Sequence, residues 1–310
     1  MLRLMFGAAL LLFASLSLLF GAMLRLGQSV VSVELAYTTF NPALGTNTVE
    51  LHAVNRGLAV TLYRGFGRIQ GISWSADGET LYFDAVRQRT HANELIALDV
   101  SNRAIRWLTN TPESESAPHT SPDGEMLVFQ RYVDARTDWD IYLLDLQNGD
   151  ITPLYEGISA DNNPAWSPDG RTIAFETASV GRNSANIMLL DLTTGDTERI
   201  TTRLDGQPAW SPDGEYLYYV SWSNMIFDVQ RMRRDGSDVQ PVIIRAGGST
   251  RPTPSLDGES LAFISGAAMT VGGQRVSGIP SVFISTIDGS DLRRITSLPV
   301  IHNHPAWRPR

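Results

Sequence analysis

The chain of 310 residues contains no cysteine. Disulfides, thiolate metal sites and lipid attachment through an N-terminal cysteine are therefore excluded. Lysine is missing as well, since all 25 basic residues are arginine, and this excludes a phosphate-binding loop of the Gly-x-x-x-x-Gly-Lys type. There is also no Gly-x-Ser-x-Gly nucleophile elbow of the hydrolase type. We therefore predict no catalytic residues, no bound metal and no cofactor.

Positive charge is scarce in this chain. The net charge is −8 and the isoelectric point is about 5.1. Binding nucleic acid requires clustered positive charge, so we predict that nucleic acid is not a partner. Hydrophobic residues make up 43% of the chain, which is enough for a sizeable core. Closed all-β folds often use a chain of this length as one domain.

The N-terminal segment from Leu4 to Leu24 carries no charge. As a helix it would extend about 31 Å, close to the apolar thickness of a bilayer. We expect a single membrane anchor, with Ser17 and Gly21 as a small-residue pair that seats another helix. A cleaved signal peptide is the alternative, although its apolar region is usually about 7–15 residues. Only Met1 to Arg3 precede the run, which favours a periplasmic or extracytoplasmic location for the rest of the chain.

One short phrase recurs along the rest of the chain. Its clearest copies are Pro-Ala-Trp-Ser-Pro-Asp-Gly at 164–170 and at 208–214. The closing glycines of five copies are separated by 46, 46, 44 and 44 residues, at Gly78, Gly124, Gly170, Gly214 and Gly258. A period in the mid-forties with four short strands per unit is typical of a β-propeller. The five turn aspartates, which could suggest carboxylate sites, are predicted to form turns instead: Asp77, Asp123, Asp169, Asp213 and Asp257.

Incomplete units at the two ends predict how the ring closes. Residues 51–57 and 59–62 have the pattern of a third and an outer strand, whereas Pro305 to Trp307 resembles an innermost strand. Val30 to Tyr37 is the candidate second strand. We therefore predict an all-β, six-bladed propeller of four-stranded blades, closed by strands from both termini and preceded by one transmembrane helix. The expected domains are an anchor at 1–24, a spacer at 25–47 and the propeller at 48–310.

The repeated phrase, together with the Leu-Leu-Asp-Leu strand at 189–192 and the following Gly195-Asp196, resembles the WD40-like Pro-Asp repeat of TolB-like β-propellers. The resemblance covers about residues 48–310. It implies a propeller that recognises a peptide segment or a loop of a partner protein. No separate α/β domain of the kind that precedes the TolB propeller is visible in this chain.

In most units, polar residues occur three and five positions before the tryptophan position. If the ring closes, these positions meet at one mouth of the central channel. His302 and His304 are two apart, so an extended strand would point both to one side. We interpret this mouth as a polar rim, a partner-binding surface or a metal site. The predicted site residues are Glu115, Asp161, Asn163, Asp205, Gln207, Arg251, His302 and His304.

The predicted function is a non-enzymatic, membrane-anchored scaffold for protein–protein interaction, an accessory subunit of a membrane or cell-envelope complex. Its partners would be other membrane or envelope proteins. The alternative is a metal-dependent enzyme that uses the channel mouth, because two histidines and three carboxylates are enough to bind a divalent cation. The polysaccharide lyase type is what the resemblance to sugar-acid lyases with a similar, metal-binding propeller implies. The glycine-rich segment from Ser265 to Pro280 is either a second contact surface or a surface loop.

Overall fold

A computed structural model describes residues 33–309, except for residues 89–90, 135–137, 180–183, 224–225, 246, 267–268, 272–273, 277 and 297–299. Every regular element in this part of the chain is a β-strand. Within it, no helix has the length and hydrophobicity needed to cross a membrane. The predicted anchor, with Ser17 and Gly21, lies outside the described residues.

From Glu34 onward the chain forms one compact unit of six four-stranded antiparallel sheets, or blades, each ordered from its innermost strand to its outermost. Blade 1 contains β26 (Ile301–Trp307), β1 (Glu34–Asn41), β2 (Thr46–Ala53) and β3 (Leu58–Phe66). Blade 2 contains β4 (Ile72–Trp74), β5 (Thr80–Val86), β6 (Asn93–Asp99) and β7 (Ile105–Trp107). Blade 3 contains β8 (Glu115–Thr120), β9 (Met126–Val133), β10 (Asp138–Asp145) and β11 (Ile151–Tyr155).

The remaining blades follow the same pattern. Blade 4 contains β12 (Ala160–Trp166), β13 (Thr172–Ser179), β14 (Ser184–Asp191) and β15 (Thr197–Arg199). Blade 5 contains β16 (Asp205–Trp210), β17 (Tyr216–Ser223), β18 (Ile226–Arg233) and β19 (Gln240–Ile243). Blade 6 contains β20 (Ser249–Pro254), β21 (Ser260–Ser265), β24 (Ser281–Thr286) and β25 (Arg293–Arg294). A separate hairpin of β22 (Met269–Val271) and β23 (Gln274–Val276) lies in the predicted insertion of blade 6.

The six innermost strands form a closed ring. Each contacts the innermost strands of both neighbouring blades, in the order β4, β8, β12, β16, β20, β26 and back to β4. Closure leaves few unpaired strand edges, which is how propellers avoid edge-to-edge aggregation. The predicted six-bladed, all-β propeller of four-stranded blades is confirmed for the described part of the chain.

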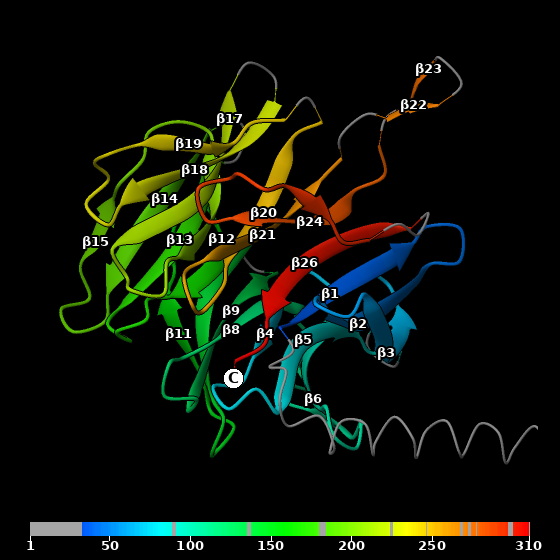
Figure 1. Cartoon of the computed structure of the whole chain (residues 1–310). Coiled ribbons are helices and arrows are strands. Elements are labelled where there is room, and N and C mark those ends of the chain that lie inside the picture. Colours follow the sequence, from blue (N-terminus) through cyan, green and yellow to red (C-terminus); the bar gives the residue numbers. More distant parts are fainter. Residues whose placement is uncertain are drawn as a thin grey trace, which may run out of the picture. The chain divides into compact units, whose positions relative to one another are not determined.

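Blade 1 is built from both ends of the described chain. β26, drawn in red in Figure 1, lies beside the blue β1 and pairs with it in antiparallel fashion, so that Leu35 is opposite Trp307 and Ala36 is opposite Ala306. The Arg308 guanidinium adds an ion pair to Glu34 (Nη1–Oε2, 2.5 Å). The predicted closure by strands from both termini is therefore confirmed.

The propeller begins earlier in the chain than residue 48. Among the described residues, β1 occupies Glu34–Asn41 and so extends four residues beyond the predicted end at Tyr37, and β2 begins at Thr46. The turn between them contains Gly45 with a φ of 63°, a left-handed conformation that suits glycine. Residues 34–47, predicted to be spacer, thus supply the second strand of blade 1 and the first residues of its third strand.

The repeated phrase has two structural roles. In the turn, the Ser167 hydroxyl donates to the Asp169 carboxylate (2.5 Å), which in turn accepts from the amide of Arg171 (3.0 Å). The same Ser–Asp hydrogen bond occurs in the other four copies, so these aspartates are turn formers, as predicted. The tryptophans link blades, because Nε1 of Trp210 donates to the carbonyl of Ala165 in the preceding blade (3.2 Å). Trp74 and Trp307 make the equivalent bonds to Ala306 and Thr253.

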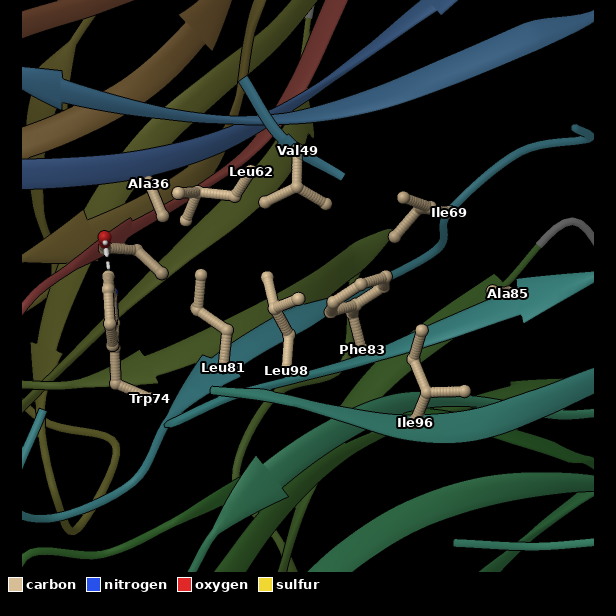
Figure 2. Close-up of a cluster of buried hydrophobic side chains, with 11 residues drawn as sticks. Ala36, Val49, Leu62, Ile69, Trp74, Leu81, Phe83, Ala85, Ile96 and Leu98 are labelled. Carbon is tan, nitrogen blue, oxygen red and sulfur yellow. Dashed lines mark hydrogen bonds between the residues drawn. The ribbon is translucent and has the colours of Figure 1, made fainter. Parts of the chain in front are cut away.

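Apolar side chains fill the junctions between blades. Figure 2 shows the junction of blades 1 and 2, where Val49 and Leu62 face Leu81 and Phe83. Full burial of a side chain of this size contributes about 1.5–3 kcal/mol. Because each third strand is packed on both faces, it carries apolar residues on both sides, as in the run from Leu95 to Leu98.

Candidate functional site

A central channel with a volume of 560 Å³ runs between the six innermost strands. Pro122, Pro168 and Pro212, from the turns after these strands, line its far end. The opposite end, which we call the channel mouth, is lined by one residue from each blade, three positions before the tryptophan or its equivalent: Gly71, Ala117, Asn163, Gln207, Arg251 and His304.

A β-bulge interrupts the innermost strand at this level. In β12 the pairing with β13 shifts between Asn162 and Ala165, and the other innermost strands except β4 shift at the equivalent place. Five residues of the mouth, the bulge residues, have left-handed backbones: Ala117 (φ 52°), Asn163 (φ 50°), Gln207 (φ 54°), Arg251 (φ 57°) and His304 (φ 46°). This conformation costs a residue other than glycine roughly 1–2 kcal/mol. Bulges redirect side chains and are frequent near functional sites.

The bulge divides the predicted site residues into two groups. Asn163, Gln207, Arg251 and His304 line the channel. Glu115, Asp161, Asp205 and His302 do not line it and are almost fully buried, with exposed fractions of 0%, 0%, 4% and 0%. The expectation that His302 and His304 point to one side is wrong, because strict alternation holds only for an unbroken strand.

Hydrogen bonds connect the polar side chains of the mouth. The Arg251 guanidinium reaches across from blade 6 and donates to Asn163 Oδ1 in blade 4 (2.9 Å). Gln207 Oε1 lies between them in the ring and accepts from the amide of Arg251 (2.9 Å). Glu176 Oε2 accepts from Asn163 Nδ2 (3.1 Å) and from the amide of Gln207 (3.2 Å). Three blades are thus joined by one polar network.

Second-strand residues hold the backbone of the mouth in place, and none of them was predicted from the sequence. Asp84, Gln130 and Glu176 occupy equivalent positions in β5, β9 and β13, 46 residues apart. Gln130 accepts from the amide of Asn163 in the next blade (2.9 Å), as Glu176 does from that of Gln207. Asp84 accepts from the amide of Gly71 (2.9 Å), and burial raises its pKa to about 7. The constant spacing of these three residues was the sequence signal that could have identified them.

The channel contains one permanently charged side chain among its described lining residues. Burial lowers the pKa of Arg251 to about 10, which still leaves it protonated at neutral pH. Burial and the charge of Arg251 hold the pKa of His304 well below its usual range. Burial likewise lowers the pKa of His119 to about 4, and its Nδ1 accepts from the amide of Trp166 (3.3 Å). Both imidazoles are therefore neutral.

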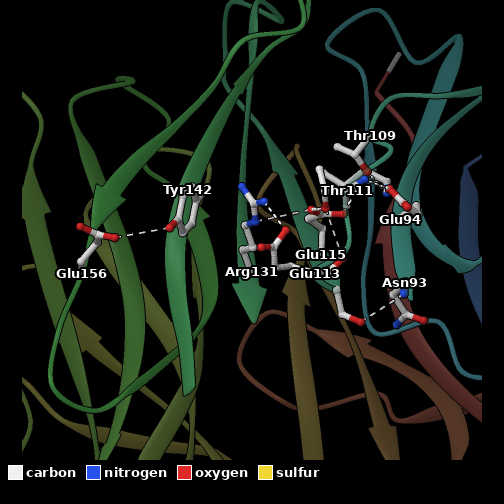
Figure 3. A network of polar contacts seen from close by, with 11 residues as sticks. Asn93, Glu94, Thr109, Thr111, Glu113, Glu115, Arg131, Tyr142 and Glu156 are labelled. Carbon is white, nitrogen blue, oxygen red and sulfur yellow. Dashed lines mark hydrogen bonds and ion pairs between the residues drawn. The ribbon is translucent and has the colours of Figure 1, made fainter. Parts of the chain in front are cut away.

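The other four predicted residues lie between neighbouring blades. Figure 3 shows Glu115 in such a junction, accepting hydrogen bonds from the hydroxyls of Thr109 (3.1 Å) and Thr111. Burial raises the pKa of Glu115 to about 7, and the nearby charge of Glu94 adds to the shift. His302 is 3.2 Å from the carbonyl of Pro280 through Nδ1.

Asp161 and Asp205 occupy the equivalent positions in the next two junctions. Burial raises the pKa of Asp161 to about 7, and the negative charges of Asp140 and Asp138 raise it further. Asp205 lines a second cavity, beside the channel.

The proposed ligands of a metal are thus kept apart. No group of three or more His, Asp or Glu side chains that could hold a metal occurs among the residues the structure describes. His304 lines the channel, whereas His302 and the three carboxylates lie in separate blade junctions. The described side chains therefore do not gather the ligand set that the lyase alternative requires.

Comparison with known proteins shows which folds this architecture is similar to. Residues 59–184 match the family model described as the TolB beta propeller domain. The fold is a TolB-like β-propeller. TolB from Acinetobacter baumannii superimposes with a TM-score of 0.77 at 19% identity, covering 90% of this chain and 67% of that one. Putative TolB from Agrobacterium tumefaciens gives 0.67 at 18% identity, over 90% of this chain and all of that one.

An oligogalacturonate lyase in complex with manganese is also similar, with a TM-score of 0.56 at 13% identity, over 83% of this chain and 75% of that one. No curated protein matches the chain. At these identities the likeness concerns the fold.

Backbone strain at the mouth can be measured where the side chain is small. We expect Ala117→Gly to raise the free energy of unfolding by about 0.5–1 kcal/mol, because glycine adopts a positive φ without strain. Gly71→Ala should destabilise the fold, since its Cβ would lie 2.5 Å from the α-carbon of Ala117. Urea denaturation tests both. Ala97→Gly, in the regular strand β6, is the control and should lower the free energy of unfolding. An equal loss in Ala117→Gly would show that the backbone of Ala117 is not strained.

The junction carboxylates predict a pH dependence of stability. Asp161 has a pKa of about 7 in the folded protein, against about 3.9 for an aspartate in an unfolded chain. The folded protein therefore binds more protons between these two values. Stability should fall as the pH rises from about 4 to about 7, by up to about 1.4 kcal/mol per pH unit for each such group. Asp161→Asn should be more stable than wild type at pH 8, with the difference shrinking toward pH 4.

Asp169→Asn provides the matched comparison for this pH series. Burial opposes ionisation of the wild-type Asp169. Hydrogen bonds from Ser167 and Arg171 and the charge of Arg234 outweigh this effect and lower the pKa of Asp169 to about 2. Its contribution is present above pH 4 and is lost only as the pH falls through 2, so this variant should be less stable than wild type at pH 8. A difference in the free energy of unfolding between Asp161→Asn and wild type that stays constant from pH 4 to 8 would show that Asp161 does not titrate in this range.

Proposed function

We propose that this protein is a non-enzymatic interaction scaffold whose channel mouth binds a segment of another protein. The observation that carries the proposal is the strained set of polar bulge residues. Gln207, Arg251 and His304 are held at positive φ, a conformation that glycine adopts without strain. An architectural role alone would be filled at lower cost by glycine. Residues kept in costly backbone conformations are concentrated at functional sites.

The mouth has the properties of a preformed recognition surface. The Arg251 guanidinium is fixed by Asn163 at one end of its side chain, and its backbone amide by Gln207. A partner segment therefore meets side chains that are already ordered, which lowers the entropic cost of binding. The partly buried Arg251, the one permanent cation among the described residues of the channel lining, favours a partner group that carries a carboxylate or several carbonyl oxygens.

The remainder of the proposal concerns location. The uncharged run from Leu4 to Leu24 supports a membrane anchor, with Ser17 and Gly21 packing on a helix of another membrane protein. The propeller would then lie on the periplasmic or extracytoplasmic side, as an accessory subunit of a membrane or cell-envelope complex. Its partners would be other membrane or envelope proteins.

Co-purification from the native membrane tests the proposal. The full chain is extracted in mild detergent, and co-purifying proteins are quantified by mass spectrometry for wild type and for the variants Arg251→Gln and His304→Gly. We expect at least one membrane or envelope partner to be lost by roughly tenfold or more in Arg251→Gln, because a charged contact truncated at an interface costs about 2–5 kcal/mol. The same partner should be weakened in His304→Gly, which removes a neutral side chain of the mouth. Glu198→Gln, on the exposed outer strand β15, is the control and should retain that partner.

Thermal unfolding of each purified variant separates loss of binding from loss of the fold. A wild-type chain that purifies without any partner would contradict the proposal. An unchanged set of partners in both mouth variants would contradict it as well.

A further inference from the structure

A second cavity lies beside the channel mouth, between blades 4 and 5, and the polar network of the mouth does not fill it. It has a volume of 360 Å³. We call it the side cavity. Its lining residues come from β13, β14 and the first three strands of blade 5 with the segment before them: Glu176, Ala185, Leu204, Asp205, Gly206, Gln207, Val220, Trp222 and Phe227.

One wall of the side cavity is aromatic. Trp222 and Phe227 are directly opposite each other on β17 and β18, with ring centroids 4.4 Å apart and planes inclined at 60°. Phe227 is 45% exposed, an unusual position for a large apolar side chain beside a cavity. Aromatic faces attract cations through the ring quadrupole.

One oxygen of a carboxylate on the cavity lining has no hydrogen-bond partner. Asp205 is 4% exposed, and its buried Oδ1 accepts no hydrogen bond. A buried acceptor left without a donor costs roughly 1–3 kcal/mol. No ion pair to Asp205 or Glu176 is found among the residues that the structure describes. A hydrogen-bond donor from a ligand would therefore satisfy Oδ1 of Asp205.

A second carboxylate reaches the cavity because of a glycine. A Cβ on Gly206 would collide with Glu176 Oε2, so only glycine leaves this space to the carboxylate. Both described hydrogen bonds to Glu176 end on Oε2, from Asn163 and Gln207. Arg251 acts on Glu176 from the channel but does not line the side cavity, so no arginine occurs among the described residues of the cavity lining.

We propose that the side cavity binds the guanidinium group of an arginine side chain belonging to the segment that docks at the channel mouth. A guanidinium stacks on an aromatic face and donates to carboxylates in a fork geometry, which matches Trp222 and Asp205. Leu204 and Val220 offer apolar contact to the side-chain stem. The net charge of −8 favours the approach of a cationic segment. The assignment rests on the proposed function, since it identifies one residue of the partner.

Binding of two short peptides to the full chain in detergent micelles tests the assignment. The probes are acetyl-Gly-Gly-Arg-Gly-Gly-amide and the same peptide with citrulline, a neutral isostere of arginine. The readout is the indole ¹⁵N–¹H NMR signal of Trp222, assigned by its loss in Trp222→Phe. We expect the arginine peptide to shift this signal in a saturable way and the citrulline peptide to bind at least roughly tenfold more weakly, the factor that about 1.4 kcal/mol produces.

Asp205→Asn keeps the shape of the side chain and should weaken the arginine peptide by a similar factor. Glu215→Gln, an exposed carboxylate of the same blade, should leave its affinity unchanged. Equal affinity for both peptides, unchanged affinity in Asp205→Asn, or no shift of the Trp222 signal would overturn the assignment. If the peptide result is negative but co-purification of the membrane partner still depends on Arg251, only the assignment of the side cavity is wrong. If the peptides behave as expected but co-purification does not depend on Arg251, the channel mouth is wrongly assigned and the side cavity remains a guanidinium site.

Discussion

The antiparallel pairing of β26 with β1 is the contact on which the rest of the structure depends. Strands from opposite ends of the described chain meet there, and every other blade consists of strands from one continuous segment. Only this pairing brings the innermost strand of blade 1 between those of blades 6 and 2. Without it the six innermost strands would not enclose a channel, and the bulge residues would not face one another. Arg308 reinforces the junction, because its Nε donates to the carbonyl of Gly78 in blade 2 (2.7 Å).

A second constraint, the bulge in the innermost strands, decides which side chains reach the channel. In the five bulged strands it turns one residue toward the axis, which is polar in four of them, and leaves the residue two positions earlier buried. The two groups then have different chemistry. Arg251 stays charged, whereas burial raises the pKa of the junction carboxylates Glu115 and Asp161 to about 7. The mouth is thus suited to binding, and the junctions make stability depend on pH.

Much of this fold could be predicted from the sequence, because the spacing of the Ser-Pro-Asp-Gly turns repeats with each blade. The incomplete units at the two ends similarly indicated a shared blade. The position of its second strand was less accessible, since Glu34 to Asn41 lacks the repeated phrase and is recognisable only through its pairing with β26. The single glycine and the two asparagines from Asn41 to Asn47 indicated a turn, but not that this turn joins two strands of the propeller.

The site could be predicted only in part. Counting back from the tryptophans correctly found Asn163, Gln207, Arg251 and His304 at the mouth. The same counting placed His302 beside His304, because it assumed an unbroken strand, and nothing in the composition of this stretch signals a bulge. Glu176 was missed although its spacing from Gln130 matched the repeat. Its role comes from contacts with the next blade, and the side cavity likewise exists only where two blades meet.

Introducing one pair of cysteines tests the closure of the ring most directly. The chain has no cysteine of its own, so a disulfide in the double variant Ala36→Cys/Ala306→Cys can form only between the new residues. These positions are directly opposite in the β1–β26 pair, where the Cα separation in antiparallel strands suits a disulfide. The structure predicts an oxidised monomer, seen by intact mass spectrometry as the loss of two hydrogens, with one peptide linking the two segments. Free thiols, or disulfides only between molecules, would show that the two strands are not paired and that the channel is not closed.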